Sequence, residues 1–289
     1  MDIILNNVHI FSKFYYIKKL IINYIYQFKF VMVNTLLRYP GGKSRAVKIL
    51  KKFIPSDTKE LCSPFFGGGA FEIFCNRKLN IKIYGYDLFE PLTNFWECVK
   101  KDKEKLSEEI KKYHPITKEK FLEIREKISD TELNEYVRAA YFFVINRSSF
   151  SGSTLSGGFS KQSGTKRFTP SSIERVKKFD STDIHVSLLH FRDSIKKHEN
   201  ILLYCDPPYY LKSKSKLYGN KGNLHYNFEH HELCEVLKKR DKWILSYNNC
   251  EEIKELYKDY RIIPTSWTYG MSKNKTSKDK EIIILSNDI

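Results

Sequence analysis

The chain has 289 residues and a formal net charge of +16, from 50 Lys and Arg against 34 Asp and Glu. Hydrophobic residues make up 41% of it, which excludes a disordered chain and is enough for one large domain or two modest ones. A positive surplus of this size predicts a polyanionic partner, because each neutralised phosphate releases counterions. A lysine-rich composition set by an AT-rich genome is the alternative explanation of the charge.

Six dispersed cysteines and a lysine-interrupted N-terminus bear on the compartment. No CxxC pair occurs, so neither a zinc site nor a redox dithiol is indicated, and reduced thiols predict an intracellular protein, in the cytoplasm of a prokaryote or in a host cell if viral. Residues 1–33 form an extension of uncertain status before the first motif. Their uncharged runs are too short for a membrane span, so no membrane partner is expected. Met32 suggests an accessory extension or an over-long start, and an interfacial helix is the alternative.

Apolar periodicity predicts alternating helices and strands. From Ser44, a credible N-cap, apolar residues recur at helical spacing to Phe53. A second helix is predicted to follow the glycines at 67–69 and to run through residue 75. Further helices are predicted at 101–127, 133–144, 232–239 and 251–258. Strands are predicted at 60–65, 81–86, 201–205, 243–246, 261–269 and 281–286. The residues at 146–170, rich in Ser, Gly and basic side chains, predict loops or hairpins, and further basic loops are expected at 212–223 and 271–280.

This order of elements predicts an α/β fold with a doubly wound sheet. The last two strands are joined only by a loop, which predicts an antiparallel edge. Ligands of such sheets bind at the carboxyl ends of the strands. The glycines at 67–69, Asp87 and Asp206 each follow a predicted strand and are therefore expected on one rim.

Two features on this rim indicate a nucleotide-like ligand. Gly67, Gly68 and Gly69 join a strand to a helix, where the lack of Cβ atoms lets the backbone approach a ligand. Asp87 follows the next strand, at the spacing where an acid accepts hydrogen bonds from ribose hydroxyls. A tight turn and a simple strand-end cap are the structural alternatives.

The tetrapeptide Asp206-Pro207-Pro208-Tyr209 is the sharpest signal. Its two prolines fix φ and leave carbonyls free to accept, and an ionised Asp offers only acceptors. Tyr209 adds a flat face for stacking. Together these groups suit a planar ring that carries an NH2 group, with its nitrogen lone pair aimed at an electrophile. The alternative is a rigid turn after a strand.

Several motifs in the same order resemble those of the Dam-type adenine-specific DNA methyltransferases. They are Leu37-Arg38-Tyr39-Pro40-Gly41-Gly42-Lys43, the FFGGG turn, Asp87, the stretch 146–152 and the DPPY tetrapeptide. The resemblance covers roughly Asn34 to Asp288. It implies a Rossmann-like methyltransferase sheet whose S-adenosylmethionine-binding domain comprises 34–95 and 185–289. Residues 96–184 would form a smaller inserted helical and loop domain that recognises DNA.

The resemblance also implies the reaction and its participants. A methyl group would pass from S-adenosylmethionine to the N6 amine of adenine in double-stranded DNA after base flipping, with no metal. A cognate restriction endonuclease, as in restriction-modification systems, is a further expected partner, and a monomer is expected.

Site residues follow from the matched motifs. Tyr39 and Lys43 would contact the cofactor, and Lys43 would pair with the carboxylate of the cofactor. Phe65, Gly67 and Gly69 would line the methionine part. Asp87 would hold the ribose, and Asp193, in the Phe191-Arg192-Asp193 segment, would reach the cofactor adenine. Asp206 would serve cofactor and target amine, with Pro207 and Pro208 as rigid neighbours and Tyr209 stacked on the flipped base. The predicted DNA contacts are Arg147, Lys161, Lys166 and Arg167.

Other classes of protein are less consistent with these motifs. A DNA-binding protein without catalysis explains the charge but not the cofactor motifs, and a methyltransferase acting on an RNA or protein amine is the closer rival. In related families, Asn or Ser tends to stand where Asp206 stands when the target is glutamine or cytosine, so Asp206 favours adenine. His230 and His231 do not match a HExxH zinc motif. The serine-rich 146–170 stretch departs from the family pattern and leaves the recognised DNA sequence open.

Overall fold

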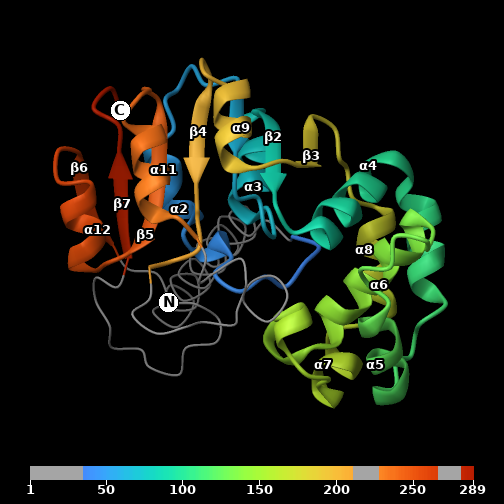
Figure 1. Cartoon of the computed structure of the whole chain (residues 1–289). Coiled ribbons are helices and arrows are strands. Elements are labelled where there is room, and N and C mark those ends of the chain that lie inside the picture. Colours follow the sequence, from blue (N-terminus) through green and yellow to red (C-terminus); the bar gives the residue numbers. More distant parts are fainter. Residues whose placement is uncertain (1–34, 211–227, 266–280) are drawn as a thin grey trace, which may run out of the picture. The chain divides into compact units, whose positions relative to one another are not determined.

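The computed structural model describes residues 35–210, 228–265 and 281–289 (Figure 1). The predictions for residues 1–33 and for the basic loops at 212–223 and 271–280 lie outside the described residues. Residues 35–289 group into one compact unit. The strand predicted at 261–269 is described only to Thr265.

A seven-stranded sheet forms the centre of the described structure, in the order β3-β2-β1-β4-β5-β7-β6. Strands β1 to β5 pair in parallel, whereas β7 pairs antiparallel with both β5 and β6. In Figure 1, β2 and β4 accordingly point one way and β7 the other. The strands are β1 (Glu60–Ser63), β2 (Lys82–Asp87), β3 (Ile184–Leu188), β4 (Leu202–Cys205), β5 (Trp243–Asn248), β6 (Arg261–Thr265) and β7 (Glu281–Leu285). The predicted α/β fold with an antiparallel edge is confirmed.

The strand order places a switch point between β1 and β4. The chain builds outward from β1 through β2 to β3, then returns to lay β4 on the other side of β1. The connections on the two sides of this point leave the sheet in opposite directions, which opens a crevice at the carboxyl ends of β1 and β4. The glycine turn follows β1 and Asp206 follows β4, so both reach this crevice.

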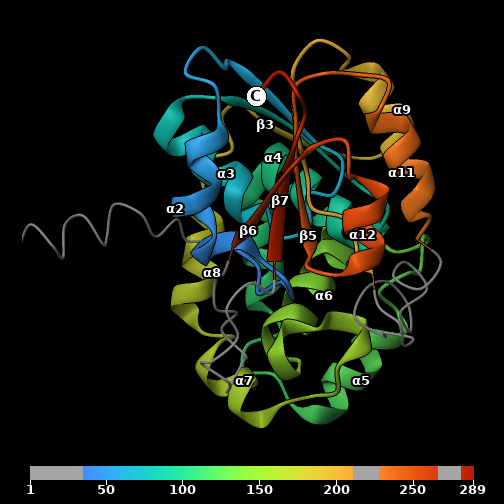
Figure 2. The same ribbon diagram turned by 90° about the vertical axis from the view of Figure 1, so that its left-hand side faces the viewer.

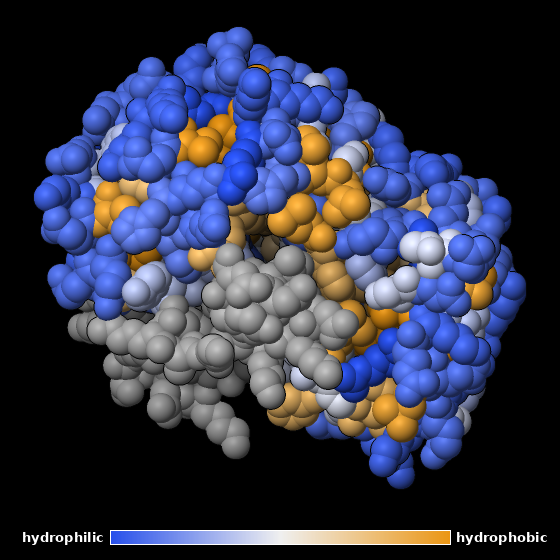
Figure 3. Space-filling model, in the orientation of Figure 1, coloured by the Kyte–Doolittle hydropathy of each residue, from blue (hydrophilic) through white to orange (hydrophobic). Residues whose placement is uncertain are grey.

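Helices cover both faces of the sheet (Figure 2). On one face, α9 (Phe191–Lys197), α11 (His230–Leu237) and α12 (Glu251–Leu256) supply side chains to a core with the central strands. On the other face, α3 (Ala70–Leu79) packs Phe71 against Tyr204 of β4, with ring centroids 4.5 Å apart. Because β4, β5 and β7 are buried on both faces, their sequences are continuously apolar rather than alternating. The surface seen in Figure 3 is mostly hydrophilic, as expected around such a core.

The first helical turn differs from its prediction. A 3-10 turn, η1 (Lys43–Arg45), precedes α2 (Val47–Leu50) and a second 3-10 turn, η2 (Lys51–Phe53). Ser44 lies inside η1, and its predicted role as N-cap is wrong because the chain enters the turn at Gly42. The apolar spacing nevertheless buries Ala46 and Leu50.

A helical segment connects β2 to β3. It contains α4 (Glu90–Lys111), α5 (Lys118–Glu126), α6 (Glu135–Ser148), η3 (Phe150–Gly152), η4 (Thr154–Ser156), α7 (Lys161–Lys166) and α8 (Pro170–Lys177). Nearly every residue of α6 is buried, so α6 is the centre of this segment. The expected domain boundary at residue 95 falls inside α4, and the boundaries at 95 and 184 stay predictions.

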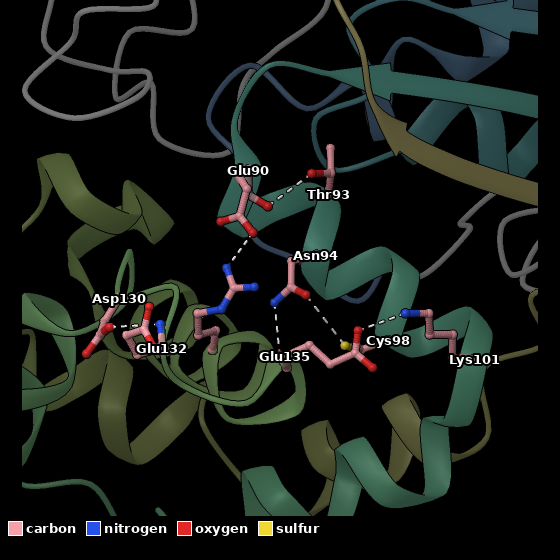
Figure 4. Close-up of polar contacts among 9 residues, drawn as sticks. Glu90, Thr93, Asn94, Cys98, Lys101, Asp130, Glu132 and Glu135 are labelled. Atoms are coloured by element: carbon pink, nitrogen blue, oxygen red, sulfur yellow. Dashed lines mark hydrogen bonds and ion pairs between the residues drawn. The ribbon is translucent and has the colours of Figure 1, made fainter.

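Polar contacts join the start of α4 to α6 (Figure 4). Glu90 pairs with Arg138, and the Asn94 side chain donates to the carbonyl of Glu135 at 3.0 Å. About two turns further along α4, Lys101 pairs with the Glu135 carboxylate at 2.7 Å. Because α4 begins directly after β2, these contacts fix α6 relative to the strand that ends at Asp87.

The stretch 146–170 matches the loops or hairpins that its composition predicts only in part. An antiparallel bridge joins Ser149 to Phe159 across two 3-10 turns, but α7 follows at Lys161–Lys166. The side chain of Asn146 is buried, donates to the carbonyl of Arg38 at 2.8 Å and accepts from its amide at 2.9 Å. Ser160 and Thr169 cap α7 and α8, and Phe168 is fully buried. The small polar residues therefore serve as helix caps and buried hydrogen-bonding groups, which composition alone does not distinguish from loop residues.

Gly69 gives a direct test of the turn after β1. It has φ +62°, and a Cβ there would lie 2.5 Å from Cζ of Phe66. Phe66 has no room to retreat, because it also lies over Gly85 and against Trp96. We expect Gly69→Ala to lower the free energy of unfolding by about 2 kcal/mol or more.

Denaturant unfolding measures this change, with Gly158→Ala as the matched control. No atom lies within 4 Å of a Cβ at Gly158, so its substitution is expected to change stability by less than about 0.5 kcal/mol. Equal stabilities of the two variants would contradict the assigned turn geometry.

Candidate active site

A cavity of about 350 Å³ lies at the carboxyl ends of β1, β2 and β4. Figure 3 shows a hollow bordered by apolar surface in the middle of the displayed face. The size falls within the range of small-molecule and cofactor sites. Four groups of residues line the cavity: 39–43, 64–72, 87–88 and 190–192, together with Tyr204, Asp206, Pro208, Phe228, Glu229 and Glu232.

Most of the predicted site residues meet at this cavity. Those that line it are Tyr39, Lys43, Phe65, Gly67, Gly69, Asp87, Asp206 and Pro208. Pro207 and Tyr209 lie beside it within the same tetrapeptide but are not part of its wall. Asp193 is exposed on α9 and also lies outside the lining, whereas its neighbours Phe191 and Arg192 belong to it.

The glycine turn after β1 forms one wall with Tyr39. A Cβ at Gly68 would lie 2.8 Å from Cβ of Tyr39, and one at Gly67 would lie 2.9 Å from its ring. The absence of these Cβ atoms lets the Tyr39 segment pack directly on the turn. The backbone of the turn is thereby presented to the cavity.

Asp87 holds the glycine turn against the end of β2. One carboxylate oxygen accepts from the amide of Gly67 and the other from the amide of Phe89, both at 3.0 Å. Burial raises the pKa of Asp87, and the backbone amides that donate to it partly oppose this rise. A carboxylate has about four lone-pair sites, so this structural role leaves acceptor capacity facing the cavity.

Lys43 and Asp206 form a buried ion pair. Nζ of Lys43 lies 2.5 Å from Oδ1 and 2.6 Å from Oδ2 of Asp206, and it also donates to the carbonyl of Gly41 at 3.1 Å. Lys43 is 3% exposed and Asp206 is 20% exposed. Burial raises the pKa of Asp206, while the charge and hydrogen bonds of Lys43 lower it. Lys43 thus favours the ionised form of this carboxyl group.

Tyr209 is held at both its hydroxyl and its ring. The hydroxyl donates to the carboxylate of Glu281, a buried residue at the start of β7. The ring centroid lies 6.0 Å from that of Tyr247 and 5.0 Å from Nζ of Lys43. Asn248 at the end of β5 donates to the carbonyl of Tyr210 at 2.9 Å. The end of the tetrapeptide is therefore fixed by two neighbouring strands.

Aromatic rings line another part of the cavity. Phe65, Phe191 and Phe228 lie with their ring centroids 5.5–5.7 Å apart, a spacing typical of interacting aromatic rings. At the rim, Arg192 pairs with Glu229 at 3.3 Å and with Glu232. The cavity thus has a charged end at Lys43 and Asp206 and an aromatic end beside α9 and α11.

A second, more open hollow of about 470 Å³ is lined almost entirely by cations, and we call it the arginine pocket. Its lining residues are Arg38, Arg147, Lys166, Arg167, Thr169, Ser171 and Arg175. Of the predicted DNA contacts, Arg147, Lys166 and Arg167 meet here, whereas Lys161 starts the same short helix α7 but does not line the pocket.

The charges of the arginine pocket have no acidic partner within the described part of the chain. Arg147 is 6% exposed, and its Nε donates to the carbonyl of Arg167 at 2.9 Å. Burial, followed by repulsion from Arg175, Arg38 and Arg167, lowers the pKa of Arg147 to about 9. Among the cations of the pocket, Arg147 is buried, Arg38 is half-buried, and Lys166, Arg167 and Arg175 are exposed. Like charges gathered in one hollow favour the binding of an anion there.

Four site residues were missed by reasoning from the sequence. Arg38 and Arg175 join the arginine pocket, Glu72 lines the cavity, and Glu281 holds Tyr209. Two of them carried a signal, because Glu72 and Glu281 are single acids beside apolar runs. Arg38 stands within the matched motif at 37–43 but was given no role there, and Arg175 carried no signal, since basic residues are frequent throughout the chain.

Comparison with known proteins identifies the family. The model of the D12 class N6 adenine-specific DNA methyltransferases matches residues 39–271. This range includes every residue that lines the cavity. The chain belongs to this family. By its family it is an adenine-specific DNA methyltransferase, and the predicted family and the predicted methylation of adenine in DNA are confirmed.

Three relatives of the methyltransferase are about equally similar to it. It is 23% identical over 246 residues to a DNA N-6-adenine-methyltransferase of Escherichia phage P1, covering 80% of this chain and 32% of the relative. It is 22% identical to the retron Ec67 DNA adenine methylase of Escherichia coli, covering 88% and 92% of the two chains. It is also 22% identical to the type II methyltransferase M.CviBI of Paramecium bursaria Chlorella virus NC1A, covering 79% and 88%. The chain thus spans about a third of the phage protein but most of the other two.

Two further findings concern the described residues of the methyltransferase only. Within them, no helix is both long and apolar enough to cross a membrane. In the same residues, His, Cys, Asp and Glu side chains nowhere gather in a group of three or more that could hold a metal ion. All six cysteines are free thiols, and five of them are buried.

The ion pair predicts how methylation depends on pH. When ionised, the Asp206 carboxylate offers only acceptors, whereas its protonated form is uncharged and presents an O–H donor to the target amine. Lys43 lowers the pKa of Asp206 against the effect of burial. Removing that charge in Lys43→Met lets burial raise the pKa further. Since activity falls as the pH drops through this pKa, the variant should lose activity at a higher pH than the wild type.

Initial methylation rates across the pH range, at saturating cofactor and DNA, measure this shift. Lys48→Met, an exposed lysine of α2 outside the cavity lining, is the control and should retain the wild-type profile. An unchanged acid limb in Lys43→Met would show that Lys43 does not control the ionisation of Asp206.

Proposed function

We propose that the chain transfers a methyl group from S-adenosylmethionine to the N6 amine of an adenine flipped out of double-stranded DNA, at the charged end of the cavity. The observation that carries this proposal is the position of Asp206. It is a largely buried carboxylate at the carboxyl end of β4, paired with Lys43 and exposed to the cavity. Its neighbours Pro207 and Pro208 have no amide hydrogen, so this wall presents acceptors to an amine.

The lining of the cavity suits S-adenosylmethionine along its length. Gly67, Gly68 and Gly69 line the cavity with backbone, because Tyr39 and Phe66 pack where their Cβ atoms would lie. Asp87 has acceptor capacity for ribose hydroxyls. The rings of Phe191 and Phe228 suit the adenine of the cofactor. Phe65, which packs against both of them, stays predicted to line the methionine part. Asp193, which lies outside the lining, is not assigned a cofactor contact. When bound, S-adenosylmethionine supplies a methyl group already activated by its sulfonium charge.

Asp206 positions the target amine for transfer. Its carboxylate accepts a hydrogen bond from the amine, and a proline carbonyl of the tetrapeptide accepts the second, so the nitrogen lone pair points toward the methyl group. Lys43 keeps the carboxylate ionised while this happens. The proton leaves the nitrogen after transfer, so catalysis rests mainly on orientation rather than on a strong base.

Tyr209 stabilises the flipped adenine by stacking. Taking a base out of the duplex costs a few kcal/mol, and stacking on an aromatic ring returns roughly 1–3 kcal/mol. The hydroxyl of Tyr209 is bound by Glu281, which restricts the ring before DNA binds. A ring held in advance loses less conformational freedom on binding.

The arginine pocket binds the DNA backbone in this proposal. Its cations have no acidic partner in the described structure, so phosphate groups would supply the missing negative charge. Residues 96–184, which contain most of the pocket, would then form the DNA-recognition domain. Lys161 remains a predicted contact outside the pocket. A monomeric state and a cognate restriction endonuclease stay predictions, the latter in line with a relative named a type II methyltransferase.

Substitution of Asp206 tests the assigned chemistry. We expect Asp206→Ala to abolish adenine methylation, because the target amine loses its charged acceptor. Tyr209→Ala should weaken methylation while largely preserving cofactor binding. The measurement is a genome-wide map of N6-methyladenine in cells that lack other adenine methylation, with cofactor affinity measured on the purified variants.

Asp193→Ala is the matched control, an exposed aspartate outside the cavity, and should methylate like the wild type. Full methylation by Asp206→Ala would refute the mechanism. Unmethylated DNA in cells that produce soluble wild-type protein would refute the proposed function.

Substitution of Arg175 tests the DNA interface. Arg175→Ala should weaken binding to all DNA sequences alike and reduce the slope of log affinity against log salt by about 1, because one phosphate contact is lost. Lys177→Ala, on the same helix but outside the pocket, should change both quantities less. Binding isotherms on duplex DNA at several salt concentrations measure both variants, and equal salt slopes would exclude Arg175 as a phosphate ligand.

A further inference from the structure

Glu72 is a buried acid in the cavity wall to which the catalytic scheme gives no role. It lies in the first turn of α3, is 3% exposed and lines the cavity. Oε1 accepts from the hydroxyl of Ser63, at the end of β1, at 2.7 Å. Apart from Ser63 and the amide of Glu72 itself, no donor in the described residues acts on this carboxylate. Within the described residues, no hydrogen bond from another residue reaches Oε2, so this oxygen keeps acceptor capacity for a ligand.

The surroundings of Glu72 favour a cationic ligand. The charged groups that act on it from neighbouring elements are Lys43 of η1 and Asp206 after β4. Lys43 already donates to both oxygens of Asp206, so two carboxylates share one cation. The other titratable groups nearby are Cys75 on α3 and Tyr204 of β4, which lines the same cavity. A buried carboxylate without its own cation is unfavourable, and a bound cation would remove this cost.

The cofactor offers three kinds of hydrogen-bond donor to such a residue. Its ribose hydroxyls are assigned to Asp87 and its adenine to the aromatic end of the cavity. The remaining donor is the α-ammonium of the methionine part, which is also the only one that carries a positive charge. Glu72 lies at the charged end, beside the glycines assigned to that part of the cofactor.

We propose that Glu72 binds the α-ammonium group of the cofactor through Oε2, while Ser63 holds the carboxylate in place through Oε1. This inference rests on the proposed function, because it takes S-adenosylmethionine as the ligand of the cavity. It adds to the site an acidic residue that recognises one end of the cofactor and takes no part in methyl transfer.

Calorimetric binding of cofactor analogues tests the assignment. The ligands are S-adenosylhomocysteine, its analogue without the α-amino group and its analogue without the α-carboxylate. Loss of the amino group should weaken binding to the wild type by about ten- to a hundredfold, the value of a hydrogen bond to a charged group. Glu72→Gln should bind S-adenosylhomocysteine more weakly by a similar factor and lose most of its discrimination against the deamino analogue.

The analogue without the carboxylate separates recognition from a general structural effect. Its binding relative to S-adenosylhomocysteine should be the same in wild type and Glu72→Gln, because Glu72 does not contact that group. Cys75→Ser, a buried residue of α3 outside the cavity lining, is the control and should discriminate like the wild type. Glu72→Gln weakening all three ligands by one common factor would overturn the assignment in favour of a purely structural role.

The pH dependence of binding provides a second measurement. Burial raises the pKa of Glu72 to about 7, and only the ionised form pairs with an ammonium group. Wild-type affinity for S-adenosylhomocysteine should therefore rise as the pH increases through this value, and Glu72→Gln should lose that rise. Glu72→Asp, which keeps the charge, should retain it and serves if the Gln variant does not fold.

Each failure has a distinct outcome. Wild-type protein that binds none of the three ligands would refute the proposed cofactor, and the assignment of Glu72 with it. Wild-type protein that binds them while Glu72→Gln still discriminates fully against the deamino analogue would refute the assignment of Glu72 alone.

Discussion

The ion pair between Lys43 and Asp206 determines how the active site is assembled. It joins the first 3-10 turn to the end of β4, two segments that are 163 residues apart in the sequence, across the switch point of the sheet. A buried ion pair contributes little net stability once the desolvation of both charges is included. Its importance lies in orientation, because Asp206 is held with both oxygens on Lys43 while it faces the cavity. The glycine turn, Tyr39 and Asp87 are arranged around these two residues.

Much of the fold could be predicted, because its strands and turns are determined by residues close to one another in the sequence. The glycines at 67–69 and the prolines at 207 and 208 restrict the backbone by themselves, and the apolar strands β4 and β5 are continuous. Strand β3 was not predicted, although its residues alternate between apolar and polar, because only Ile184 and Val186 are buried and the strand ends in exposed residues. Residues 146–170 were assigned to loops because they are rich in serine and glycine. In the structure, several of these serines cap helices or form buried hydrogen bonds. That use of serine depends on tertiary neighbours such as Arg38.

The same distinction explains which site residues could be predicted. Lys43, Asp87 and Asp206 belong to short motifs, so their positions followed from the strands that precede them. The arginine pocket combines Arg38 with residues more than a hundred positions later. The motif at 37–43 singles out the segment of Arg38 but not its place in this pocket, and nothing in the local sequence of Arg175 distinguishes it from other basic residues. Glu72 needed the structure for another reason: only its burial beside Ser63 shows that it is not an ordinary acid in the first turn of a helix.

The contact between Asn146 and the backbone of Arg38 has a consequence for how two ligands influence each other. Arg38 lines the arginine pocket, whereas the next residue, Tyr39, lines the cavity at the glycine turn. A movement of this backbone segment therefore alters the walls of both sites at once, and Asn146 carries that movement into α6. Energetic coupling between two binding sites is reciprocal. To the extent that occupation of one site shifts the segment, the affinity at each site changes by the same factor when the other is filled.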